Sequence, residues 1–309
     1  MVPLAYLAIY VIWGSTFLAI RLAVETIPPL LMMGVRCTIA GSLLLAAALI
    51  RRERPTARQW GIGMAAGALM FGLPYAAIAS AELRITSGMA ALLVATLPLW
   101  LVVIEWVRSG RPSPRTLAGL GIGLFGVIVL VSNSLSVPAS IAPMIAIVVG
   151  ELAWAVGSVY LQPRLPQSIT LNAGMPLLSG GALLLVSSAL VGEMRVFDLR
   201  AVTPASLAAL GYLTLFGSII AFSAYVFLLR SASASRVSTH AYVNPLIAVS
   251  LGVMLAGEPV TTSIVTASVV IAAGVALVLS ARQNRSTFRA TSPSKSTYGW
   301  LASRSAARS

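Results

Sequence analysis

The chain has 309 residues, of which 58% are hydrophobic and only 9% are charged, and its mean hydropathy is +0.92. Soluble proteins carry about 25% charged residues, and a soluble core of this size is too small to hide so much apolar surface. These figures exclude a soluble globular protein and indicate an integral membrane protein. The single cysteine, Cys37, excludes an internal disulfide framework and a cysteine-based zinc site.

The net charge of +13 comes from 21 basic and 8 acidic residues. Nearly all of the basic residues lie in short segments between apolar runs or in the C-terminal tail. There they set the topology and contact anionic lipid headgroups. We therefore expect membrane lipids, and not nucleic acid, to be the partners of this charge.

Ten apolar runs are each long enough to cross a bilayer as a helix, which takes about 20 predominantly apolar residues. The alternating pattern of a membrane β-barrel is absent. The sequence therefore predicts an all-α integral membrane protein with ten transmembrane helices. In chain order, the expected helices cover residues 4–20, 29–49, 60–80, 85–107, 115–132, 141–161, 172–191, 205–229, 237–256 and 262–281.

The basic residues also predict the orientation of these helices. With a cytoplasmic N-terminus, the cytoplasmic loops hold most of the basic residues, even when the tail is left out of the comparison. Both termini are therefore expected in the cytoplasm. No basic segment precedes the first apolar run, so we expect an uncleaved signal-anchor. Residues 282–309 are rich in Ser, Thr and Arg and are expected to form a disordered basic tail.

The two halves of the chain resemble each other in order. Pro98-Leu99 in the fourth expected helix corresponds to Pro245-Leu246 in the ninth, at an offset of 147 residues. Each half holds five expected helices, and an odd number makes the second half start on the opposite side of the membrane. The halves are therefore expected to be inverted repeats, which are typical of secondary transporters. The two five-helix repeats cover residues 4–132 and 141–281.

Several short motifs follow one another in order along both halves. They are Trp13-Gly14-Ser15-Thr16-Phe17, Pro28-Pro29 followed by Arg36, Ala40-Gly41, Ser87-Gly88, Thr96-Leu97-Pro98-Leu99-Trp100, Leu215-Phe216-Gly217-Ser218, Ala241-Tyr242-Val243-Asn244-Pro245 and Leu255-Ala256-Gly257-Glu258. Together they resemble the EamA family of the drug/metabolite transporter superfamily, and most of all its inner-membrane exporters. The resemblance covers about residues 4–281. It implies ten helices in two inverted repeats and the export of small metabolites or drugs.

The sequence holds no motif for ATP-driven transport or for catalysis. A phosphate-binding loop ends in Gly-Lys-Ser/Thr, whereas the single lysine, Lys295, lies in the tail. Residues 121–126 fit GxGxxG, but they lie within an apolar run, where close helix packing is the favoured interpretation. With one histidine and one aspartate, we expect no enzyme activity, no cofactor and no metal site.

Polar and aromatic side chains recur at helical spacing on several expected helices. Packing explains many aromatic stripes, but adjacent polar groups favour a cavity, because hydrocarbon offers them no hydrogen bonds. Trp13 and Trp154, which correspond in the two repeats, are the preferred walls, and such walls suit an aromatic or amphipathic substrate. The candidate pathway residues are Tyr10, Trp13, Tyr75, Trp100, Glu151, Trp154, Ser158, Ser218, Tyr225, His240 and Asn244.

Two prolines and one arginine interrupt the apolar helices. Pro98 and Pro245 each remove a backbone donor and are interpreted as gating hinges, with fixed packing bends as the alternative. Arg36 lies about a third of the way into the second expected helix, where a charge is costly. We expect it to form a structural ion pair with Glu82, with Glu25 as the other possible partner, or to extend its side chain to the membrane surface; binding of an anionic substrate is the alternative.

Glu151 lies ten residues from either end of the expected helix at 141–161, close to the bilayer midplane. Its repeat counterpart is Tyr10, so the fold does not require an acid at this position. A low dielectric disfavours a charged carboxylate, which makes reversible protonation feasible. We expect Glu151 to carry a coupled proton or to receive a cationic substrate; a hydrogen-bonded structural acid is the alternative.

These features predict a secondary transporter that exports small molecules across the inner membrane by alternating access. An inward metabolite or amino-acid permease and a passive channel are the alternatives. The expected partners are a small-molecule substrate and membrane lipids, with proton coupling as one driving mode. Both a monomer and a homodimer fit the sequence.

Overall fold

The computed structural model describes residues 1–309 except for 110–112, 133–140, 232–236, 238–239 and 281–309. Its described residues form helices and contain no strand, so the expected all-α class is confirmed for them. The expected basic tail at 282–309 lies outside the described residues. Within the described part, seven helical segments are long and apolar enough to cross a membrane, namely Val2–Ala23, Pro29–Ile50, Ala57–Ala81, Ser87–Arg108, Ile141–Arg164, Ile169–Leu190 and Pro204–Ser231.

The helices follow the expected apolar runs closely. The first half holds α1 (Val2–Ala23), α2 (Pro29–Ile50), α3 (Ala57–Gly67), the π-helix η1 (Ala68–Gly72), α4 (Leu73–Ala81), α5 (Ser87–Val94), α6 (Leu97–Ser109) and α7 (Pro114–Ser132). The second half holds α8 (Ile141–Val156), η3 (Gly157–Leu161), η4 (Gln162–Arg164), α9 (Ile169–Leu190), α10 (Glu193–Val196), η5 (Leu199–Ala201), α11 (Pro204–Tyr212), η6 (Leu213–Ala221), α12 (Phe222–Ser231), α14 (His240–Ala256) and α15 (Thr262–Ser280). Helices α7, α14 and α15 occupy the three remaining expected runs.

Hydroxyl side chains cap the start of at least six of these helices, α3, α5, α7, α9, α11 and α15. Thr56 and Gln59 form a reciprocal capping box at the start of α3. Thr86, Ser168 and Thr203 each accept a hydrogen bond from a main-chain N–H of the first turn of α5, α9 and α11. These caps satisfy N–H groups that have no partner within the helix, so they explain where the helices begin.

The fourth expected helix is interrupted in the structure. Helix α5 ends at Val94 and α6 begins at Leu97, and the Thr96 hydroxyl donates to the Leu93 carbonyl at 2.7 Å. Pro98 therefore lies in the first turn of α6, where a missing N–H costs little. Pro245, in contrast, lies inside α14. The two prolines correspond in sequence but occupy different helical positions, and their role as gating hinges stays a prediction.

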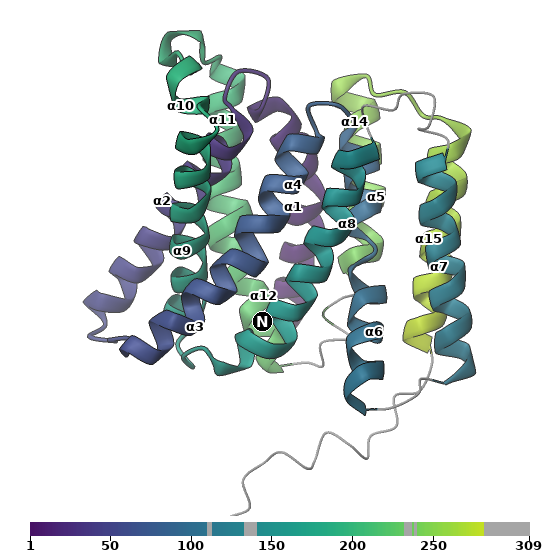
Figure 1. The fold of residues 1–309 in the computed structure, drawn as a ribbon, viewed down its shortest axis with the longest axis horizontal. Coiled ribbons are helices and arrows are strands. Elements are labelled where there is room, and N and C mark those ends of the chain that lie inside the picture. Colours follow the sequence, from purple (N-terminus) through teal and green to yellow (C-terminus); the bar gives the residue numbers. More distant parts are fainter. Residues whose placement is uncertain (110–112, 133–140, 232–236, 238–239, 281–309) are drawn as a thin grey trace, which may run out of the picture.

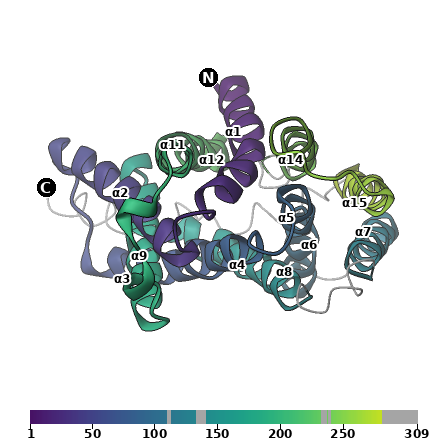
Figure 2. The same cartoon turned by 90° about the horizontal axis from the view of Figure 1, so that it is seen from above.

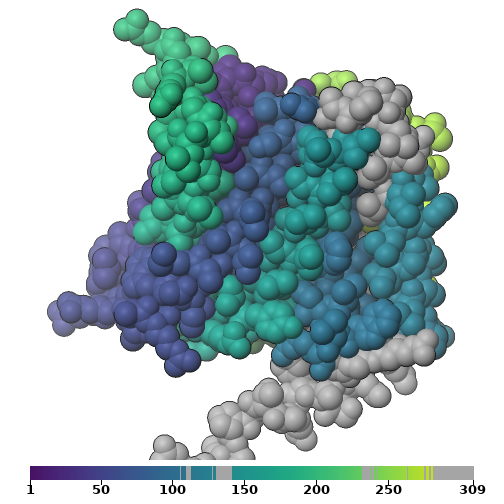
Figure 3. Space-filling model, in the orientation of Figure 1, coloured from purple at the N-terminus to yellow at the C-terminus, as the bar shows by residue number. Residues whose placement is uncertain are grey.

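The helices form an elongated bundle (Figures 1 and 2). Helices α7 and α15 pack together at one end, and α2, α3 and α9 pack together at the other. Between them stand α1, α4, α5, α8, α12 and α14. Figure 3 shows α8 filling the middle of one face, and the segment around α10 projecting beyond its neighbours. Apolar side chains such as Leu43, Phe125 and Leu215 are exposed on the outside, as lipid-facing positions are.

Glycines bring the end pairs of helices into main-chain contact. A Cβ added at Gly41 of α2 would lie 2.4 Å from the Leu178 nitrogen of α9. A Cβ at Gly274 of α15 would lie 2.4 Å from the Gly123 nitrogen of α7. Small residues at such crossings let membrane helices approach closely. Gly123 belongs to the GxGxxG segment, which therefore packs against another helix.

Two glutamates tie α2 and α9 together at opposite ends. The Glu193 carboxylate, at the start of α10, accepts hydrogen bonds from the Leu30 and Leu31 main-chain N–H groups at 3.2 and 2.9 Å. The Glu53 carboxylate, just after α2, accepts from the Ser168 hydroxyl at the start of α9. Glu193 thus caps the positive N-terminal end of α2, whereas Glu53 binds the hydroxyl that caps the N-terminal end of α9.

Replacing Glu193 by alanine is expected to destabilise the fold by about 1 kcal/mol, because two N–H groups of α2 lose their acceptor. The measurement is the apparent melting temperature of the purified protein in detergent, which should fall by several degrees. Glu25 precedes α2 on the same side but is exposed, so Glu25→Ala is the control and should leave the temperature unchanged. Equal effects of both variants would contradict the capping role.

Candidate functional site

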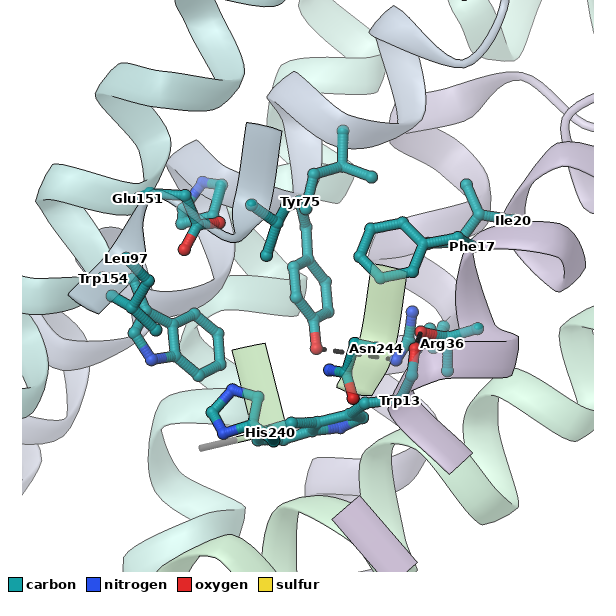
Figure 4. Close-up of a pocket in the computed structure, with 14 residues that line it drawn as sticks. Trp13, Phe17, Ile20, Arg36, Tyr75, Leu97, Glu151, Trp154, His240 and Asn244 are labelled. Atoms are coloured by element: carbon teal, nitrogen blue, oxygen red, sulfur yellow. Dashed lines mark hydrogen bonds between the residues drawn. The ribbon is translucent and has the colours of Figure 1, made fainter. Parts of the chain in front are cut away.

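A buried cavity lies at the centre of the bundle, where helices of both halves meet (Figure 4). Its volume is about 70 Å³, well below the ~300–1,000 Å³ of ordinary ligand pockets. A substrate of metabolite size therefore enters only when the surrounding helices or side chains move apart. The lining side chains that the sequence singled out are Trp13, Arg36, Tyr75, Glu151, Trp154, His240 and Asn244.

Aromatic side chains form one wall of this cavity. Trp13 of α1 and Trp154 of α8 meet edge to face, with ring centroids 6.2 Å apart. Tyr225 of α12 packs against both, at 5.2 and 6.1 Å. The Trp13 indole N–H also donates to the Gly217 carbonyl at 3.2 Å, so its ring is held in place. Trp13 and Trp154, the two tryptophans that the sequence singled out as cavity walls, are thus neighbours in space.

Helix α14 contributes His240 and Asn244, which are one turn apart and therefore share a face. The His240 Nδ1–H donates to the Val237 carbonyl at 2.8 Å, and its ring packs on Trp13 with centroids 5.0 Å apart. Both side chains are buried. The structure thus brings this pair to the cavity while also giving His240 the hydrogen bond that a structural histidine would have.

Glu151 lies on the opposite side of the cavity from Arg36, with Tyr75 between them (Figure 4). Its side chain is only 3% exposed, and among the described residues no hydrogen bond or ion pair to its carboxyl group is found. The preceding Gly150 packs against Pro74, whose Cα would lie 2.9 Å from an added Cβ. An isolated buried carboxylate is costly, so this position suits a group that exchanges a proton or meets a cationic ligand.

Arg36 has different partners from the one expected. Its Nε donates to the Ser218 hydroxyl at 2.7 Å, one terminal nitrogen lies 3.6 Å from the Met33 sulfur, and the other lies 3.5 Å from the Tyr75 hydroxyl. None of these groups is acidic. The reason is rotational, because the face of α2 that carries Arg36 points to the cavity and to η6.

Glu82 lies just beyond the end of α4 and does not pair with Arg36. The prediction of an ion pair between these two residues is therefore wrong. Both carboxyl oxygens of Glu82 are buried and have no hydrogen-bond partner among the described residues, while its main-chain oxygen accepts a hydrogen bond from Arg21. Burial first, and the Glu258 carboxylate second, raise the pKa of Glu82 well above its ordinary value. The neutral acid is therefore the form that this site favours.

The other predicted residues lie around or away from the cavity. Ser218 supports Arg36, and the Ser158 hydroxyl lies 3.3 Å from that of Tyr225 behind the aromatic wall. The Trp100 N–H donates to the Val148 carbonyl at 3.0 Å and so joins α6 to α8. Tyr10 packs beside Tyr6, with ring centroids 5.8 Å apart. Tyr10, Trp100, Pro98 and Pro245 do not line the cavity.

Half of the lining residues were not among the predicted ones. Among them, Phe17 is the residue that the sequence could most easily have predicted, since it lies one turn beyond Trp13 in the aromatic stripe of the first helix. The rest are small or apolar side chains that sequence patterns do not distinguish from lipid-facing ones. They are Thr16, Ile20, Pro74, Ile78, Val94 and Leu97.

A partly polar cavity between the two halves of a helical membrane protein is typical of membrane transporters. The sequence model of the EamA-like transporter family matches residues 2–132 and 141–280. The chain therefore belongs to the EamA-like transporter family, as the sequence motifs indicated.

Individual relatives agree with this assignment. The chain is 38% identical over 258 residues to the "uncharacterized inner membrane transporter YedA" of Escherichia coli K12. These residues make up 82% of each of the two proteins. It is 24% identical over 280 residues to a "probable amino-acid metabolite efflux pump" of Salmonella typhimurium, covering 87% of this chain and 91% of the relative. A solved crystal structure with 22% identity and a TM-score of 0.66 covers 91% of this chain and 98% of its own, which shows the same fold. The protein is thus a multi-pass inner membrane transporter.

Proposed function

We propose that this protein is a secondary transporter that exports small molecules by alternating access, with the central cavity as its substrate site. The observation that carries the proposal is the origin of the cavity walls. Trp13, Arg36 and Tyr75 come from the first half, and Glu151 and His240 come from the second. A site between two halves is typical of secondary transporters. One relative is named as a probable efflux pump, which favours the outward direction.

Helix packing supports two inverted five-helix repeats at 4–132 and 141–281. If the halves are repeats, α1 corresponds to α8, α4 to α12, and the pair α5 and α6 to α14. The contact of α1 with α14 then has its counterpart in the contact of α8 with α5 and α6, and the contact of α4 with α8 has its counterpart in that of α12 with α1. The α2–α9 and α7–α15 contacts map onto themselves. The π-helices η1 and η6 lie at corresponding places. Ten membrane crossings with both termini in the cytoplasm complete this arrangement.

The energy source in this proposal is an ion gradient or substrate exchange. Glu151 is the candidate proton carrier or cation receptor, because it is buried, faces the cavity and has no acidic or basic partner among the described residues. Aromatic walls make the cavity suitable for an aromatic or amphipathic substrate. Its small volume is in keeping with a conformation closed around the site, which alternating access requires.

The test is transport by the purified full chain in proteoliposomes. Labelled aromatic and amphipathic compounds are offered with and without an imposed pH gradient, and counterflow is measured against unlabelled compound inside. A carrier gives saturable flux and counterflow. Flux that rises linearly with concentration and shows no counterflow would indicate a channel instead. Inside-out membrane vesicles separate export from import, because an exporter accumulates its substrate in them.

Replacing both Pro98 and Pro245 by alanine is expected to slow transport about tenfold, the effect of about 1.4 kcal/mol on a barrier, without reducing the amount of protein in the membrane. Since Pro245 lies inside α14 and Pro98 in the first turn of α6, Pro245→Ala alone should account for most of the effect. Pro204→Ala, at the first residue of α11, is the control. An unchanged transport rate in the double variant would rule out the hinge.

A further inference from the structure

The guanidinium of Arg36 is a buried cation, and among the residues that the structure describes no acidic group pairs with it. The side chain is 2% exposed and lines the cavity. Only the hydrogen bond from its Nε to Ser218, at 2.7 Å, is short. The contacts of its terminal nitrogens with Met33 and Tyr75 are 3.6 and 3.5 Å long, and its Cζ lies 4.8 Å from the centre of the Tyr75 ring. Because a guanidinium has five N–H donors, several are left for a ligand.

The structure holds this guanidinium in place rather than neutralising it. A Cβ added at Gly217 would lie 2.8 Å from an Arg36 terminal nitrogen, so the absence of a side chain there makes the room that the guanidinium occupies. Ser218, the next residue, accepts the Nε–H. Both belong to the π-helix η6, a type of helical segment that is often found at functional sites. Neutral groups on one side therefore leave the charge available on the cavity side.

Neither Glu82 nor Glu151 supplies a negative charge beside Arg36. The carboxyl group of Glu82 is influenced by Arg21 and Glu258, and Arg36 is not one of its partners. Glu151 lines the same cavity but stands across it, beyond Tyr75 (Figure 4). A buried charge is tolerated when it is paired, so an anionic group of the ligand is the natural partner for Arg36.

We propose that Arg36 binds the carboxylate of the transported substrate, with Ser218 orienting the guanidinium, so that the cavity selects small amphipathic carboxylates. This rests on the proposed function and adds the substrate class to it. The planar fork of arginine matches a carboxylate in a bidentate manner, and Trp13 and Trp154 cover the apolar part. A phosphate dianion fits less well, because Arg36 supplies one positive charge for its two negative charges, and Glu151 lines the same cavity.

The experiment compares pairs of probes that differ only in charge. They are 3-phenylpropanoate with 3-phenylpropanamide, and hexanoate with hexanamide. Binding to the purified full chain in detergent is followed by tryptophan fluorescence and by the shift in melting temperature. The wild type is expected to bind at least one acid about tenfold more tightly than its amide, which is the effect of a charge-assisted hydrogen bond.

In Arg36→Gln the preference for the acid is expected to disappear, whereas binding of the amide stays within about twofold of wild type. Gly217→Ala keeps the charge but pushes the guanidinium away, so it should weaken acid binding while the melting temperature without ligand stays near that of wild type. Gly211→Ala is the matched control in the preceding helix, because an added Cβ there meets no atom within 4 Å.

Three outcomes are distinguishable. Retention of the acid preference in both Arg36→Gln and Gly217→Ala would overturn the assignment of Arg36. Absence of any acid preference in the wild type would overturn the substrate class, and saturable transport of other compounds would then leave the proposed function standing. Acid-selective binding that depends on Arg36 but occurs without saturable flux would support the binding site and contradict the proposed function.

Discussion

Replacing Glu151 by glutamine is expected to reduce pH-gradient-driven transport to the rate measured without a gradient. Glutamine has nearly the same size and keeps a hydrogen-bonding oxygen, but it cannot bind and release a proton. Because Glu151 is buried, faces the cavity and lacks a charged partner among the described residues, the neutral side chain should be accommodated. Insertion and melting temperature should therefore match the wild type.

Two measurements separate the two roles of Glu151. If it only carries the coupled proton, exchange of substrate across the membrane without a gradient survives in Glu151→Gln. If it receives a cationic group, the variant loses affinity for a cationic probe such as phenethylamine. Wild-type proton-driven efflux would eliminate the first role, and unchanged affinity for the amine would eliminate the second. Glu25→Gln, at an exposed position, is the control for the loss of an acid.

The second large effect is expected at the contact of α2 with α9, where Gly41→Leu should prevent folding. An added Cβ would lie 2.4 Å from a main-chain nitrogen, that of Leu178, and a main chain cannot turn aside as a side-chain end can. Overpacking costs about 1–3 kcal/mol in ordinary cores and more where the backbone must shift. The helices would have to separate, which also breaks the hydrogen bonds of Glu53 and Glu193.

The measurement is the yield of monodisperse protein by size-exclusion chromatography, together with its melting temperature. Gly41→Leu should give little or none. Gly61→Leu in α3 is the matched control, since an added Cβ at Gly61 meets nothing within 4 Å. A monodisperse Gly41→Leu protein with the wild-type melting temperature would show that the contact tolerates separation and would contradict the prediction.

Local patterns in the sequence were sufficient for the elements. Length and hydropathy located the helices to within a few residues. The offset between repeats pointed to Trp13 and Trp154, and the structure places them together. Helical spacing placed His240 and Asn244 on one face, which does line the cavity. Such inferences succeed because they depend on neighbours along the chain.

Contacts between segments that are far apart in the chain could not be predicted from the sequence. Arg36 was expected to meet Glu82, but the rotation of α2 about its axis turns it towards Ser218, 182 residues away. Trp100 and Tyr10 carry the same aromatic signal as Trp13, yet Trp100 bonds to α8, Tyr10 packs beside Tyr6 of its own helix, and neither lines the cavity. In a membrane helix, apolar residues cover both the lipid side and the core side, so hydropathy does not reveal the buried face.

The sequence by itself determined that this protein lies in a membrane, where its helices are and which family it belongs to. These inferences need only the length of the apolar runs, the polar breaks between them and the order of the motifs, which are local properties of the chain. The tertiary structure alone decided which polar groups share the cavity and which charge has no counter-charge among the described residues. The physical reason is that these relations depend on helix rotation and close approach. Glycines such as Gly41 and Gly217 set them, through atoms that are far apart in the sequence.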